Sequence, residues 1–176
     1  MNKVKVIVVN GLSRSGKDSF IEALRKKVPV LVEHSTIITV WDALLDYNMI
    51  DLKKKGPEER EFLAAVKQAW INYNDGPFFE VVHIAEELEK EYAFASGIDR
   101  VLFAVHVREP KEMRKLKQYF KKRMTTVLIK RPDTKPQPGD EEVNDWAYDH
   151  LVYNDGDLED LDDKADRFIT FLNEIE

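Results

Sequence analysis

The sequence contains no cysteine, and this absence removes several kinds of chemistry at once. Disulfide frameworks, thiol nucleophiles and cysteine-ligated zinc all need a residue that the 176-residue chain does not have. The histidines show no metal-ligand spacing; they are His34, His83, His106 and His150. We therefore expect a function that works without a zinc site or a reactive thiol.

Long apolar runs and an excess of positive charge are missing as well. The apolar start, Val4–Val9, is short, is interrupted by Lys5 and leads into a glycine turn, so it predicts part of the fold and not a signal peptide. The formal net charge of −6 provides no general electrostatic reason to bind nucleic acid. We expect a cytoplasmic globular protein with no membrane or nucleic-acid partner. The sequence predicts no oligomeric state.

What the chain does contain is a regular alternation of strand-like and helix-like segments. Five runs rich in β-branched and apolar residues predict strands, namely Lys3–Asn10, Thr36–Val40, Arg100–Val107, Thr125–Lys130 and Leu151–Tyr153. Helices are predicted over Asp18–Lys27, Trp41–Met49, Lys111–Lys122 and Leu158–Ile175, and from Pro57 and Pro77 onward. This order predicts a single three-layer α/β domain over residues 1–176, with a five-stranded parallel sheet flanked by helices.

Two segments interrupt the alternation. Residues 41–95 are mainly helical and form an insertion after the second predicted strand. Residues 131–144 contain three prolines and a glycine among polar residues, which predicts a loop longer than is usual in a compact domain. A long loop of this kind is typical of a functional lid, and a simple linker is the alternative.

The loop after the first strand has the pattern G-x-x-x-x-G-K, formed by Gly11, Gly16 and Lys17. Glycines let the backbone wrap closely around phosphate oxygens, the following helix N-terminus supplies partial positive charge, and the lysine neutralises the terminal phosphate. A buried strand precedes the loop and a helix follows it, which is the context that phosphate binding requires. We therefore predict that ATP phosphates bind at Gly11, Ser13, Arg14, Ser15, Gly16, Lys17, Asp18 and Ser19. A purely structural glycine turn is the alternative.

One position departs from the usual pattern, because Asp18 replaces the serine or threonine that normally follows the lysine. Asp18 could hold Mg²⁺ through water or orient the acceptor, while Ser19 could supply the missing hydroxyl. An acidic residue in the first turn of a helix is also favoured by the helix dipole alone. Asp18 and Ser19 are thus the candidate metal ligands, and a structural role for Asp18 stays open.

The run S-R-S-G-K-D-S at Ser13–Ser19 resembles the S-G-K-D loop of bacteriophage-type deoxynucleoside monophosphate kinases and of animal-type phosphomevalonate kinases. Both belong to the P-loop kinase superfamily. A looser likeness extends to V-H-V-R-E-P at Val105–Pro110 and to Y-D-H-L-V-Y-N-D-G-D-L-E-D-L at Tyr148–Leu161. The second run also resembles the ending of guanylate kinases, which implies that Asn154 and Asp155 lie near the nucleotide base.

The resemblance implies a magnesium-dependent kinase that moves the γ-phosphoryl group of ATP to a (deoxy)nucleoside monophosphate. A phosphomevalonate-type acceptor and a nucleotide-binding protein without turnover are the alternatives. Where the family has an aspartate two residues before the strand-end arginine, this chain has His106 before Arg108. Glu109, Asp18 or Asp42 could take the missing acidic role, and the sequence does not rank them.

Phosphoryl transfer needs positive charge on the travelling group, and arginine suits this task. Arg108 and Arg131 follow predicted strands, so Lys17, Asp18, Arg108 and Arg131 are the candidate catalytic residues. A strand-end arginine can also be a plain ion-pair partner.

Two further features have a weaker signal. Trp41 and Asp42, just beyond the second predicted strand, are candidates for acceptor contacts. The dense basic cluster over Lys111–Arg123 is typical of a solvated helix face. A nucleic-acid surface is disfavoured there, because few aromatic residues are interleaved with the charges.

Overall fold

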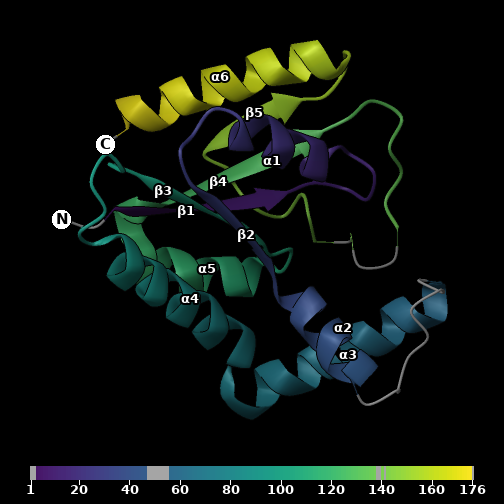
Figure 1. Ribbon diagram of the computed structural model, residues 1–176. Coiled ribbons are helices and arrows are strands. Elements are labelled where there is room, and N and C mark those ends of the chain that lie inside the picture. The colour runs from purple at the N-terminus through teal and green to yellow at the C-terminus, as the bar shows by residue number, and fades with distance from the viewer. Residues whose placement is uncertain (1–2, 47–55, 138–139, 141, 176) are drawn as a thin grey trace.

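The computed structural model describes residues 3–46, 56–137, 140 and 142–175. Its centre is a five-stranded, fully parallel sheet with the order β2-β3-β1-β4-β5 (Figure 1). The strands are β1 Val4–Asn10, β2 Leu31–Ser35, β3 Val101–His106, β4 Met124–Lys130 and β5 His150–Tyr153. The prediction of a five-stranded parallel α/β sheet is confirmed.

β1 lies in the middle of the sheet because its residues are apolar on both sides. All seven of its residues are buried, and Ile7 pairs with Ala104 of β3 and with Thr125 of β4. Ile7 and Val9 face one apolar core and Val6 and Val8 face the other, as the two-residue period of a strand requires. A strand covered on both faces explains the nearly continuous apolar run in the sequence.

Helices cover both faces of the sheet and make three layers (Figure 1). On one face lie α1 Lys17–Arg25 and α6 Leu158–Glu174, which share a core built around Phe20 and Phe168. On the other face lie α4 Gly76–Tyr92 and α5 Pro110–Phe120, followed by the short 3-10 helix η1 Lys121–Arg123. Among the described residues between Lys130 and His150, none lies in a helix or strand, which agrees with the predicted long loop.

The insertion between β2 and β3 begins with α2 Thr36–Asp46 and α3 Pro57–Asn74, which lie beside the main body (Figure 1). These two helices share a small apolar cluster of their own, formed by Val40, Leu44 and Leu63. The turn to α4 is tight, because a Cβ on Gly76 would lie 1.7 Å from the indole nitrogen of Trp70.

The second predicted strand was placed wrongly. Residues Thr36–Val40 open α2, and the strand is Leu31–Ser35 instead. Thr36, Val40 and Leu44 are the buried residues of α2, and their spacing of four is helical, so packing overrides the β-branched composition. Within the described residues, Leu31–Ser35 is an edge strand paired with β3 alone. It therefore tolerates the polar residues that concealed it in the sequence.

Candidate functional site

The loop between β1 and α1 needs its two glycines for distinct steric reasons. Gly11 has φ +153°, and a Cβ there would lie 2.5 Å from the backbone oxygen of Ile129. Gly16 has φ +94°, and a Cβ there would lie 2.1 Å from Nδ2 of Asn154. Arg14, between them, also has a positive φ of 65°. The loop is therefore a backbone turn that side chains at positions 11 and 16 would disrupt.

The helix that follows presents its positive end to this loop. Gly16 is the N-cap of α1 and has no side chain that could accept from the first-turn amides. Such amides, together with the helix dipole, form an anion-binding position. The first turn carries Asp18 and the exposed Ser19, both of which were predicted to lie beside the phosphates.

Lys17 is turned back toward its own loop. Its Nζ donates to the backbone oxygens of Gly11 at 2.8 Å and Leu12 at 2.9 Å. Burial, together with the nearby Arg108 guanidinium, lowers the pKa of Lys17 to about 8 against the opposing effects of Asp140 and Asp18. A bound phosphate would stabilise the protonated form, because an opposite charge favours the charged state of an amine.

Arg108 reaches the same loop through a residue that the sequence reasoning missed. Its Nη1 lies 2.9 Å from Oδ1 of Asp140, and Oδ2 of Asp140 accepts from the backbone N–H of Ser13 at 2.8 Å. Arg108 is therefore linked to the phosphate loop through the carboxylate of Asp140. Asp140 belongs to the long loop between β4 and β5, and only the fold brings it here.

Asp18 lies next to two side chains from neighbouring strands. Ligand atoms of Asp18, Glu33 and His106 all lie within 4.8 Å of one another. His106 Nε2 is 2.9 Å from Oε1 of Glu33, and this hydrogen bond is the main reason that the pKa of Glu33 is lowered. Two carboxylates suit a magnesium ion, which prefers oxygen ligands, whereas an imidazole is more usual for transition metals.

The acidic alternatives to Asp18 lie elsewhere. Glu109 accepts from Nζ of Lys67 at 2.8 and 2.9 Å, and this ion pair keeps the pKa of the Glu109 carboxyl low despite its partial burial. Asp42 is exposed in the second turn of α2. Glu33 had no signal in the sequence, because the strand that carries it was misplaced. Among the acidic residues that we considered, only Asp18 joins the cluster of three.

Asn154 and Asp155 are adjacent in the sequence but contact different parts of the structure. The buried Asn154 packs against the back of the phosphate loop, where its Nδ2 donates to the backbone oxygen of Ser15 at 2.8 Å. Asp155 is exposed and pairs with Lys164 of α6 at 2.6 Å, which lowers the pKa of Asp155. The hydroxyl of Ser15 is buried and has no hydrogen-bond partner among the described residues.

A cavity of about 260 Å³ lies between the phosphate loop and the loop after β4. Leu12 and the strand end Leu128–Lys130 form one side, and Arg131, Thr134, Val143 and Asn144 complete the lining. Arg131 is exposed, and it thus borders a space of ligand size next to the phosphate loop.

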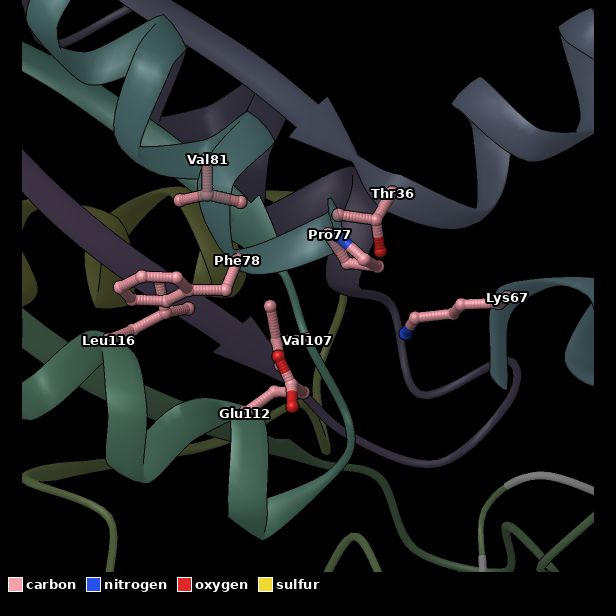
Figure 2. Close-up of a pocket in the computed structure, with 8 residues that line it drawn as sticks. All are labelled: Thr36, Lys67, Pro77, Phe78, Val81, Val107, Glu112 and Leu116. Atoms are coloured by element: carbon pink, nitrogen blue, oxygen red, sulfur yellow. The ribbon is translucent and has the colours of Figure 1, made fainter. Parts of the chain in front are cut away.

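A second, narrower cavity lies where the helical insertion meets the main body. Figure 2 shows the polar ends of Thr36, Lys67 and Glu112 directed toward it, with apolar walls from Phe78 and its neighbours. Thr36 Oγ1 and Glu112 Oε2 are buried and have no hydrogen-bond partner among the described residues. The cavity has room for about one water molecule. Trp41 and Asp42 do not line it.

The basic residues of α5 and η1 are partly neutralised within the fold. Lys115 pairs with Asp75 and Glu112, and Lys117 pairs with Asp149. Arg123 pairs with Glu89. These pairs neutralise part of the charge on this helix face. Within the described part of the chain, no helix has the length and apolar character needed to cross a bilayer.

The sheet order and the position of the phosphate loop define the fold of P-loop kinases, and solved structures agree. The chain is similar to the APS kinase CysC of Mycobacterium tuberculosis, with 14% identity, a TM-score of 0.52 and coverage of 98% of this chain and 99% of that one. A structure of that kinase in complex with AMPPNP and APS gives 12% identity, a TM-score of 0.53 and coverage of 98% and 99%. The dephospho-CoA kinase from Campylobacter jejuni gives 12% identity, a TM-score of 0.51 and coverage of 97% and 98%. No family model matches the chain, and no curated protein matches it either.

Proposed function

We propose that the protein is an ATP-dependent phosphotransferase that moves the γ-phosphoryl group to a (deoxy)nucleoside monophosphate. The observation that carries the proposal is the phosphate loop itself. Its glycines are sterically required, Lys17 belongs to it, and Arg108 approaches it from the end of β3. In parallel α/β sheets, ligands bind beyond the carboxyl ends of the strands, and all of these groups lie at that edge.

The proposed reaction needs positioned charge more than covalent chemistry. An oxygen of the acceptor phosphate attacks the γ-phosphorus, the bond to the β–γ bridging oxygen breaks, and ADP leaves with that electron pair. Lys17 and the first-turn amides of α1 would hold the donor phosphates, and Arg108 would stabilise charge on the travelling group. Arg131 borders the cavity beside the loop, where the nucleoside of the donor would lie.

A magnesium ion would neutralise phosphate charge during the transfer, and the neighbouring carboxylates of Asp18 and Glu33 would supply the oxygen ligands it prefers. The hydroxyl of Ser19, in the same first turn of α1 as Asp18, would be a further oxygen ligand. His106 contacts Glu33 and would orient its carboxylate.

The acceptor is proposed to lie between Arg108 and the helical insertion. The cavity with Thr36, Lys67 and Glu112 begins at Val107, the residue before Arg108. It admits about one water molecule in this structure, so an acceptor would require α2 and α3 to move. Their separate apolar cluster is consistent with such a movement, because little apolar packing would be broken.

A phosphorylated acceptor other than a nucleotide, such as phosphomevalonate, fits the same loop. A nucleotide-binding protein without turnover is the second candidate function. Two observations favour it: His106 stands at the strand end where the family has an aspartate, and Asp140 already contacts both Arg108 and the phosphate loop.

The test is a coupled assay of ADP release with a panel of (deoxy)nucleoside monophosphates and phosphomevalonate. We expect turnover that depends on one acceptor and is lost in Lys17→Ala. Lys26→Ala is the matched control, because Lys26 is an exposed lysine at the end of the same helix. ATP binding without turnover on any acceptor would refute the kinase function and leave the non-catalytic candidate.

A further inference from the structure

The phosphate loop of this structure already binds an anion that comes from the chain itself. The side chain of Asp140 is fully buried, with 0% of its surface exposed. Its carboxylate accepts from the backbone N–H of Ser13 at 2.8 Å, from the Ser13 hydroxyl at 3.4 Å and from the backbone N–H of Gln137 at 3.1 Å. The Arg108 guanidinium lies 2.9 Å from it. A buried carboxylate with this many donors is well satisfied.

Three of these donors belong to groups that the proposed function assigns to phosphate. The Ser13 amide is part of the phosphate loop, and Arg108 is the proposed charge-stabilising residue. We call the Ser13 N–H, Lys17 and Arg108 the phosphate cradle. A backbone N–H makes one strong hydrogen bond, so a phosphate oxygen and the Asp140 carboxylate cannot both use the Ser13 amide well.

The remaining member of the cradle is also engaged within the protein. Lys17 donates to two backbone oxygens of its own loop, while the negative charge of Asp140 raises its pKa against the dominant effect of burial. The positive groups of the cradle are thus all partnered before any nucleotide arrives. A second anion placed beside the Asp140 carboxylate would be repelled by it.

We propose that Asp140 is an internal competitor for the phosphate cradle, which nucleotide phosphates must displace in order to bind. The inference rests on the proposed phosphate-binding role of the loop. In the ligand-free protein, the Asp140 carboxylate therefore occupies the phosphate cradle. The apparent affinity for nucleotide is lowered in proportion to the fraction of molecules in which the cradle is occupied in this way. Asp140 is a regulatory residue in this scheme and not a catalytic one.

The hydrogen bonds around Asp140 also predict which backbone group moves with it. Asp140 and Gln137 are linked in both directions, because the Gln137 N–H donates to the carboxylate and the Asp140 N–H donates to the Gln137 oxygen at 2.9 Å. Displacement of the carboxylate therefore releases the Gln137 amide. The Ser13 amide, in contrast, exchanges the carboxylate for a phosphate oxygen and stays bonded.

The first experiment measures ATP binding by calorimetry in the wild-type protein, Asp140→Asn and Asp133→Asn. Asp133 is an exposed aspartate of the same loop, so Asp133→Asn is a matched change of charge outside the cradle. We expect Asp140→Asn to bind ATP about tenfold more tightly than the wild type, and Asp133→Asn to bind it as the wild type does. Equal or weaker binding by Asp140→Asn would overturn the proposal.

The second experiment uses the wild-type protein alone and is informative even if Asp140→Asn does not fold. Residue-resolved amide hydrogen exchange is measured with and without saturating ATP. We expect ATP to accelerate exchange at Gln137 while Ser13 stays protected. Continued protection of Gln137 in the ATP-bound protein would show that the carboxylate keeps its place, and would overturn the proposal even if Asp140→Asn binds more tightly.

These outcomes are separate from those of the kinase assay. If the protein binds ATP and Gln137 exchanges faster, but no acceptor is phosphorylated, the internal competitor is supported and the kinase function is refuted. If an acceptor is phosphorylated while Gln137 stays protected in the ATP-bound protein, the kinase function is supported and the internal competitor is refuted.

Discussion

Gly16 provides a quantitative test of how the phosphate loop is built. An alanine at this position meets two penalties, because its φ is +94° and its Cβ would lie 2.1 Å from Nδ2 of Asn154. The left-handed backbone costs a non-glycine residue about 1–2 kcal/mol. The overlap must push Asn154 away and break its hydrogen bond to the backbone oxygen of Ser15, and leaving that buried oxygen unsatisfied costs about 1–3 kcal/mol.

We therefore expect Gly16→Ala to lower the free energy of unfolding by about 2–5 kcal/mol. For a chain of this size the melting temperature should fall by about 5–15 °C. The free energy is measured by denaturant titration with linear extrapolation to water.

Gly97 supplies a matched control. Its φ of +76° is also positive, but a Cβ there has no atom within 4 Å. Gly97→Ala thus carries the backbone penalty and the same change in the unfolded chain, without the overlap. Equal losses for the two variants would refute the argument that the Asn154 contact requires glycine. A double variant with Asn154→Ala isolates the contact, because removal of the asparagine should reduce the cost of Gly16→Ala to that of Gly97→Ala.

Three other predictions follow from the same geometry. The pKa of Lys17 is lowered to about 8 in the folded protein, from 10.5 for an ordinary lysine. Between these two pH values the folded protein binds fewer protons than the unfolded chain. Stability should accordingly rise with pH across this window. ATP affinity should fall as the pH rises through 8, and Lys17→Arg should abolish this fall, as titration calorimetry at a series of pH values would show. Lys67→Met should destabilise the protein by about 1 kcal/mol, because it leaves the Glu109 carboxylate, which is 36% exposed, without its cation. Lys67→Met with Glu109→Gln should recover much of this loss in the same denaturant titration. Glu33→Gln should weaken Mn²⁺ binding, followed by water relaxation, by about tenfold, and unchanged binding would remove Glu33 from the candidate metal site.

The phosphate loop and the strand before it could be predicted from the sequence because their signals are local. The spacing of Gly11, Gly16 and Lys17 and the apolar run of β1 each act within a few residues, and the structure confirms the strand, the loop and the helix in that order. The start of α4 was equally local, because Pro77 predicts the beginning of a helix and α4 begins at Gly76.

β2 was misplaced because its stability comes from its neighbour. Leu31–Ser35 carries Glu33 and His34 and becomes a strand by pairing with β3. Thr36–Val40 has the stronger strand propensity but buries a helical face against α3. Propensity is a weaker determinant than packing in both segments.

By itself, then, the sequence determined that this protein has a phosphate loop between a central strand and a helix, and that five parallel strands would align their carboxyl ends at one edge. Those properties depend on residues close together in the chain. Only the tertiary structure decided which groups meet at that edge. Glu33 joins Asp18 because β2 lies beside β3, and Asn154 supports Gly16 because the chain returns after β5. Asp140 reaches the phosphate cradle from a loop that is 127 residues away from Ser13 in sequence. No local pattern specifies such a contact, because its partners are adjacent only once the sheet has formed.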